Sequence, residues 1–188
     1  APLLAVFPGS RAGEITRLWP IFRSSIAQLT AQMPSLRVAV QVPPHLLARM
    51  QGLVDATTLL LPSTEDKKDL FAAATAAIAK SGTIGLECAL AGLPSIIAYR
   101  ASALTAYMLR RLITVKFVNL ANLLAGRMII PELIQENCTP ERIVQAVQPL
   151  LMDAHAREAQ QRDLRDVAAM LGVNDSQSPS EKAAEIIL

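Results

Sequence analysis

The sequence predicts an α/β fold, a Rossmann-like parallel sheet flanked by helices, with a helical C-terminal tail. The prediction rests on short apolar runs and on the longer segments between them, whose apolar residues recur with the 3.6-residue period of a helix. Strands that are apolar at every position are buried on both faces, as in a parallel sheet covered by helices. The 188 residues are enough for one domain with a sizeable core.

The expected strands are the apolar runs at residues 3–7, 36–41, 57–61, 76–79 and 94–99. Segments with helical periodicity lie between or after them, for example residues 14–33 and 101–113, and they allow right-handed crossover connections. Pro20 interrupts the first of these segments, so we expect a kink or a new helix start there. After Pro131 we expect no further strand.

Residues 139–188 are expected to form the C-terminal helices of this single domain, 1–188. Thr139 followed by Pro140 is typical of a helix start, with a cap residue and then proline at the first helical position. Ser178 followed by Glu181 has the spacing of a capping box. A short polar break, NDSQSPS, precedes that second helix start.

Composition narrows the classes of function. The net charge of +2 is too small to argue for a nucleic-acid partner. Two cysteines, Cys88 and Cys138, provide no disulfide framework, so a reducing compartment is expected. The sequence has no initial methionine and starts directly with a strand pattern, so we expect it to be part of a longer protein.

Two loops carry the features of an anion site. One is PGSRAGE, which follows the first strand, and the other is KSGTIGLE, which follows the fourth. In a parallel sheet both would lie at the edge where ligands bind, and each would begin a helix whose free N–H groups attract an anion. The candidate binding residues are Gly9, Ser10, Arg11, Ser81, Gly82 and Thr83.

A single Gly-Ser turn is more often only a structural helix cap. Two such turns on one sheet edge, one with an arginine suited to phosphate oxygens, favour a phosphate ligand. Neither loop has the lysine of a Walker A motif or the GxGxxG pattern of dinucleotide-binding proteins.

Glu87 follows Thr83 by four residues, so the two share a helix face if the helix begins near Thr83. A carboxylate is unsuited to a diphosphate but suits a ribose diol beside it. The alternative is an acid that stabilises the helix through its dipole. Spacing does not decide between these two hypotheses.

Other candidates are weaker. His45 and His155 have no nearby carboxylate pattern, and no Cys/His cluster has metal-ligand spacing, so no metal site and no cofactor are expected. Arg110, Arg111 and Lys116 follow an apolar stretch; they either contact an anionic membrane surface or cap a helix in water.

The chain resembles the C-terminal half of bacterial lipid-A-disaccharide synthases, which are glycosyltransferases of the GT-B type. The matching stretches are FPGSRAGEI, KSGTIGLECALAGLPSIIAYR, RRLITVKFVNLANLLAGR and IPELIQENCTPERI, in the order and spacing of the family. Two positions depart from its usual pattern: Ala121 replaces a common proline, and Gly85 replaces alanine or threonine.

The resemblance implies an inverting enzyme that transfers 2,3-diacylglucosamine from UDP to 2,3-diacylglucosamine 1-phosphate through a β-1,6 bond. This chain would be the donor-binding half; the acceptor domain and the general base would lie in an N-terminal domain absent from it. The resemblance further implies a cytoplasmic protein at the periphery of the inner membrane.

The resemblance also implies roles for individual residues. The loop at Ser81–Thr83 would hold the UDP diphosphate, and Glu87 would bind its ribose. Arg11 would stabilise charge on the leaving diphosphate in place of a metal ion. Asn122 would bind the nucleotide, and Tyr99 and Glu132 are candidates for lining the donor site.

Two alternative functions remain open from the sequence. One is another UDP-sugar GT-B enzyme, such as a cell-wall N-acetylglucosamine transferase or an epimerase, which shares the diphosphate loop and the acid. The other is a non-catalytic nucleotide-binding module.

Overall fold

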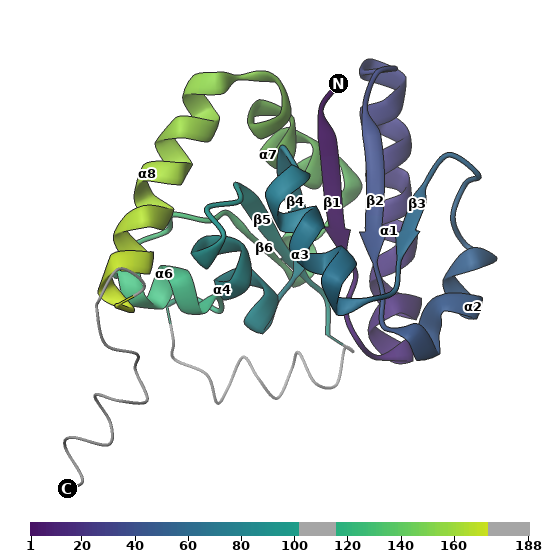
Figure 1. Cartoon of the computed structure of the whole chain (residues 1–188), viewed down its shortest axis with the longest axis horizontal. Coiled ribbons are helices and arrows are strands. Elements are labelled where there is room, and N and C mark those ends of the chain that lie inside the picture. The colour runs from purple at the N-terminus through teal and green to yellow at the C-terminus, as the bar shows by residue number, and fades with distance from the viewer. Residues whose placement is uncertain (102–115, 173–188) are drawn as a thin grey trace, which may run out of the picture.

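The computed structural model describes residues 1–101 and 116–172, and this part of the chain forms one six-stranded parallel sheet with helices on both faces (Figure 1). The strands are β1 (Leu3–Phe7), β2 (Arg37–Gln41), β3 (Leu59–Leu61), β4 (Ala76–Lys80), β5 (Ser95–Tyr99) and β6 (Glu132–Ile134). Their order is β3-β2-β1-β4-β5-β6, and every neighbouring pair is parallel. This is the strand order of the Rossmann fold, so the predicted fold class is confirmed.

The helices are α1 (Ala12–Gln32), α2 (Leu47–Gln51), α3 (Thr64–Ala73), α4 (Thr83–Leu90), α6 (Leu120–Ala125), α7 (Pro140–Met152) and α8 (Ala154–Met170). Two 3₁₀ turns, Pro44–Leu46 and Gln135–Asn137, complete the described elements. Thr139 caps α7 as predicted, because its side chain accepts a hydrogen bond from the N–H of Arg142.

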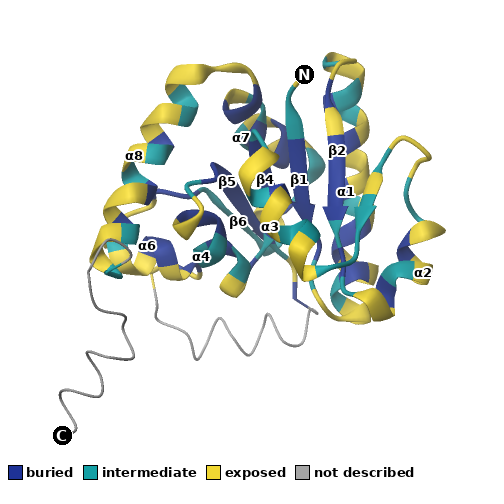
Figure 2. Ribbon diagram, in the orientation of Figure 1, coloured by how far each residue is buried: buried dark blue, intermediate teal, exposed yellow. Residues whose placement is uncertain are grey.

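The sheet separates two hydrophobic cores. Leu4 and Val6 of β1 belong to a core shared with α1 and α7, whereas Ala5 and Phe7 belong to one shared with α3, α4, α6 and α8. This alternation follows from the two-residue period of a strand. Strands β1 and β4 are buried along nearly their whole length (Figure 2), which is why their sequences are apolar at almost every position.

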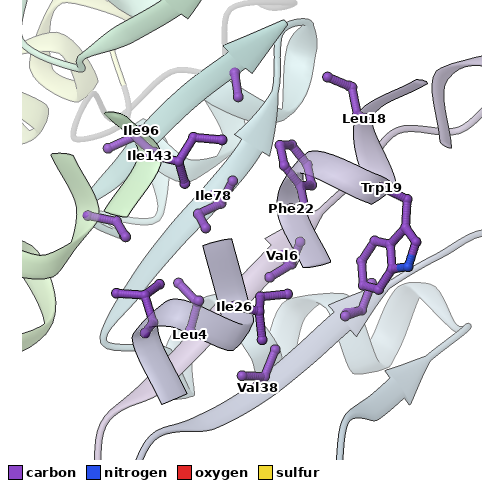
Figure 3. Packing of buried hydrophobic residues seen from close by; sticks show 14 of the residues in the cluster. Leu4, Val6, Leu18, Trp19, Phe22, Ile26, Val38, Ile78, Ile96 and Ile143 are labelled. Atoms are coloured by element: carbon purple, nitrogen blue, oxygen red, sulfur yellow. The ribbon is translucent and has the colours of Figure 1, made fainter. Parts of the chain in front are cut away.

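Helix α1 supplies much of the first core (Figure 3). Leu18, Trp19, Phe22 and Ile26 lie on one face of the helix and pack above the side chains of β1, β2 and β4. The indole N–H of Trp19 donates to the carbonyl of Leu53 at 3.0 Å, so this buried polar group is satisfied.

One expectation about secondary structure was wrong, and so was one of the two alternatives expected at Pro20. A strand does follow Pro131: β6 pairs with β5 in the register Ile97 to Glu132. Strand β6 has only three residues and lies at the sheet edge, so it has no apolar run that a sequence pattern could detect. Pro20 also does not begin a new helix; α1 continues through it, with the proline on the exposed face.

Several predictions fall outside the described residues. They are the helix expected over most of residues 101–113, with Arg110 and Arg111, and the capping box from Ser178 to Glu181 with the polar break before it.

Candidate functional site

The two predicted loops meet because of the strand order. Strands β1 and β4 are neighbours, yet β1 continues into α1 on one face of the sheet and β4 into α4 on the other. The two connections therefore diverge at the carboxyl ends of β1 and β4. Such a switch point is where open α/β sheets bind their ligands.

A cleft of about 350 Å³ lies at this switch point, a volume within the usual range for small-molecule sites. It is formed by the loops after β1 and β4, the start of α4, the end of β2, and α3. The lining residues are Phe7, Gly9, Ser10, Arg11, Glu14, Gln41, Pro43, Lys67, Lys80, Ser81, Gly82, Thr83, Ile84 and Glu87. All the residues predicted from the two loops, together with Glu87, are thus brought into one cleft.

The first loop is organised around Glu14. Arg11 is the N-cap of α1, and the Glu14 carboxylate accepts hydrogen bonds from the backbone N–H groups of Ser10, at 3.1 Å, and Arg11, at 3.3 Å. The Arg11 guanidinium donates to the same carboxylate at 3.1 Å. We expected these N–H groups to be free to donate to a phosphate, but in this structure they donate to the Glu14 carboxylate.

The second loop leaves its helix start without a side-chain cap. Gly82 is the N-cap of α4 and has a φ of 149°, a conformation that glycine adopts without strain. Thr83 is the first helical residue, as the sequence argument assumed. With no side chain at the cap, the orphan N–H groups of the first turn of α4 are oriented for a ligand in the cleft.

Glu87 has a partner that sequence reasoning missed. Its carboxylate forms an ion pair with Lys67 of α3, and both side chains line the cleft. The Lys67 ammonium lies 5.7 Å from the ring centre of Phe71, which in turn stacks on Phe7 in the cleft wall. Because α3 and α4 approach only in the folded chain, no spacing rule could have identified this pair.

Lys80 was also missed, although it begins the KSGT stretch. It is the last residue of β4, and its ammonium lies 3.1 Å from Glu14 and 5.4 Å from the ring centre of Tyr99. A lysine at the carboxyl end of a strand, two residues before a glycine helix cap, is a sequence signal that could have been used. Tyr99 is not among the cleft-lining residues, although its ring lies near the Lys80 ammonium.

Burial raises the pKa of the Glu14 carboxyl, but the hydrogen bond and charge of Lys80, with further bonds from Arg11 and Ser10, outweigh it. The pKa therefore lies below the ordinary value, so the carboxylate is charged at neutral pH.

Asn122 and Glu132 do not line the cleft. Asn122 is completely buried: its amide donates to the carbonyl of Ile130 and to Glu132, and its oxygen accepts from the N–H groups of Ile129 and Ile130. Glu132 also accepts from the backbone N–H groups of Val118 and Asn119. In this structure the two side chains fasten the segment around α6 to β6.

The remaining candidates offer no second centre. Among residues 1–101 and 116–172, no group of three or more His, Cys, Asp and Glu side chains could hold a metal ion. Cys88 and Cys138 are free and buried, and desolvation is the main cause that raises their thiol pKa values, to about 12 and about 11. None of the described helices is both long enough and apolar enough to cross a membrane.

A family model described as lipid-A-disaccharide synthetase matches residues 1–187. The chain is 41% identical over 191 residues to the lipid-A-disaccharide synthase of Rhodospirillum centenum and 38% identical over 190 residues to that of Gluconobacter oxydans. All of this chain is covered in both matches, against 47% and 46% of the relatives. The chain therefore spans about half the length of these curated relatives.

Solved structures of glycosyltransferases share the fold. The glycotransferase of kitacinnamycin superposes with a TM-score of 0.62 at 19% identity, covering 99% of this chain and 42% of the other. The C-terminal domain of a group 1 glycosyl transferase from Francisella tularensis has a TM-score of 0.59 at 12% identity, covering 90% of this chain and 85% of that domain. At these identities the likeness establishes the fold.

Proposed function

The chain belongs to the lipid-A-disaccharide synthase family, and from that membership we propose that it is the donor-binding half of such an enzyme. The intact enzyme transfers 2,3-diacylglucosamine from UDP to 2,3-diacylglucosamine 1-phosphate and forms the β-1,6 disaccharide with inversion. The acceptor site and the general base belong to the other half of the enzyme, which these residues do not supply.

The observation that carries the proposal is the cleft at the switch point. It combines the uncapped start of α4 at Gly82 with Lys67, Lys80 and Arg11, and it places the carboxylate of Glu87 one turn further along α4. The positive groups attract a diphosphate. A carboxylate one helical turn away can accept hydrogen bonds from the ribose hydroxyls next to that diphosphate. Ser81 and Thr83 add hydroxyl donors on the same loop.

The chemistry proposed for this half is electrostatic. When the bond between sugar and phosphate breaks, negative charge grows on the leaving diphosphate. Arg11 stands at the cleft with a largely exposed side chain, at 79% relative exposure, so its guanidinium can reach a ligand. A fixed positive group at the leaving oxygens lowers the barrier without a metal ion.

The chain should bind UDP, and a chelator should not change the affinity, because lysine, arginine and helix N–H groups supply the positive charge. Titration calorimetry with and without chelator measures this. The control is ADP, which offers the same diphosphate with a different base and should bind more weakly. Absence of UDP binding would overturn the proposed function. A drop of about tenfold in UDP affinity when chelator is added, about 1.4 kcal/mol, would show that binding depends on a metal ion.

Glu87→Ala should weaken UDP binding by about 1.5–3 kcal/mol, as expected for a lost hydrogen bond to a charged group. Affinity for inorganic pyrophosphate should be unchanged or higher, since the ribose contact is absent and a negative charge has been removed. The matched control is Glu65→Ala on the exposed side of α3. Unchanged UDP affinity in the Glu87 variant would mean that this acid serves only as the partner of Lys67.

We further propose a cytoplasmic enzyme in peripheral contact with the inner membrane, where acylated substrates would be met. Support comes from several large apolar side chains that are exposed in the segment that follows Lys116 in the sequence. These are Val118, Leu120, Leu123, Leu124 and Met128.

A further inference from the structure

Glu14 already places a negative group in the cleft. Its carboxylate accepts hydrogen bonds from the backbone N–H groups of Ser10 and Arg11 and from the Arg11 guanidinium. It also forms an ion pair with the ammonium of Lys80. The side chain is only 15% exposed, so these contacts hold it in the wall of the site rather than in solvent. This set of donors, two backbone N–H groups and two cations, is the set that binds a phosphate group elsewhere.

Gly9 makes room for this carboxylate. Its φ of 114° is open to glycine but strained for other residues, and a Cβ there would lie 2.5 Å from Oε2 of Glu14. The glycine of the first loop therefore leaves space for the Glu14 carboxylate.

Lys80 connects the two loops. Its side chain is 18% exposed and extends from the end of β4 toward Glu14, on the α1 side of the cleft. The same ammonium lies 3.7 Å from the position that a Cβ of Gly82 would take, so it is also close to the start of α4. A single cation thus lies between the carboxylate on the first loop and the uncapped helix start on the second.

We propose that Lys80 binds the diphosphate of the donor and that Glu14 is the counter-ion that holds Lys80 in the absence of ligand. This inference rests on the proposed function. A diphosphate carries more negative charge and more acceptor oxygens than a carboxylate, so it replaces Glu14 at Lys80 and at the N–H groups of the first loop. When the diphosphate leaves, the carboxylate returns, and the cation never remains unpaired in a partly buried cleft.

The exchange has two consequences of opposite sign. Removing Lys80 takes away an attractive contact to the ligand, so binding weakens. Removing the charge of Glu14 takes away a competitor, so binding becomes tighter. A pair that served only to join α1 to β4 would stabilise the fold and leave ligand affinity unchanged.

The test is titration of the chain with UDP and, separately, with inorganic pyrophosphate, for the wild type and four variants. Lys80→Met should weaken both ligands about ten- to a hundredfold, the effect of a lost charge-assisted hydrogen bond. Glu14→Gln should tighten both about three- to tenfold. Glutamine still serves in the capping box, so the helix start is kept.

The matched controls are Lys68→Met, which removes the same charge from an exposed position of α3, and Glu158→Gln, on the exposed side of α8. Both should bind like the wild type, and thermal melts confirm that every variant is folded. Lys80→Met that binds like Lys68→Met, or Glu14→Gln that binds no more tightly than Glu158→Gln, overturns the inference while the proposed function stands. A wild-type chain that binds neither UDP nor pyrophosphate overturns both.

Discussion

Asn122→Ala should lower the free energy of unfolding by at least about 3 kcal/mol, because each of the three backbone groups left unpaired in a buried place costs about 1–3 kcal/mol. These groups are the N–H groups of Ile129 and Ile130 and the carbonyl of Ile130. The variant also removes the donor that Asn122 offers to Glu132. For a domain with a typical stability of about 5–15 kcal/mol, this is a large fraction of the total.

Denaturant titration followed by circular dichroism measures the effect. Asn122→Asp separates shape from hydrogen bonding: it keeps the acceptor for Ile129 and Ile130 but turns an oxygen toward Glu132, so it should be destabilising at neutral pH as well. The control is Asn137→Ala, an exposed position bonded to Arg142, which should change stability by about 0.5 kcal/mol or less.

The resemblance implied a different role for Asn122, that of a nucleotide contact. An Asn122→Ala variant with wild-type stability and a loss confined to UDP affinity would support that role and contradict the structural one. The structural role predicts the reverse order: stability falls first, and UDP binding falls only because the folded fraction does.

Arg11→Ala should reduce kcat by about 10²–10³ in a two-domain enzyme that carries this chain as its donor half, the usual effect of losing an electrostatic donor at a developing charge. UDP affinity should fall much less. The Arg11 side chain is mostly in solvent, at 79% relative exposure, so its contribution to ground-state binding is small. In the proposed function, the arginine instead stabilises the charge that grows in the transition state.

Steady-state kinetics with matched binding measurements separate the two effects. Arg11→Lys keeps the charge but loses the planar fork, so its kcat should lie between those of the wild type and Arg11→Ala. Arg17→Ala, an exposed position of α1 outside the cleft, should behave like the wild type. An unchanged kcat in Arg11→Ala would make Arg11 a structural helix cap, the alternative raised by the frequency of such turns.

Sequence alone was sufficient for the fold class and for identifying the two loops that line the cleft. The apolar runs at residues 3–7 and 76–79 became central strands because buried parallel strands need apolar residues on both faces, a requirement visible in any window of the sequence. The loops after these strands were identified by glycines next to helix starts, which is also local chemistry. The start of α4 at Thr83 and the Thr139 cap of α7 were predictable for the same reason.

The partners of the polar side chains could not be read from the sequence. Glu14 ends the PGSRAGE stretch, and nothing in its spacing identifies Lys80 as its partner; the pairing of β1 with β4 brings the two side chains together. Lys67 meets Glu87 only because α3 and α4 lie on the same face of the sheet. Asn122 donates to Glu132, and Glu132 is held in place because β6 pairs with β5. Local spacing determines which backbone groups need a partner, whereas the charge or amide that supplies it comes from whichever distant segment the sheet order brings within hydrogen-bond distance.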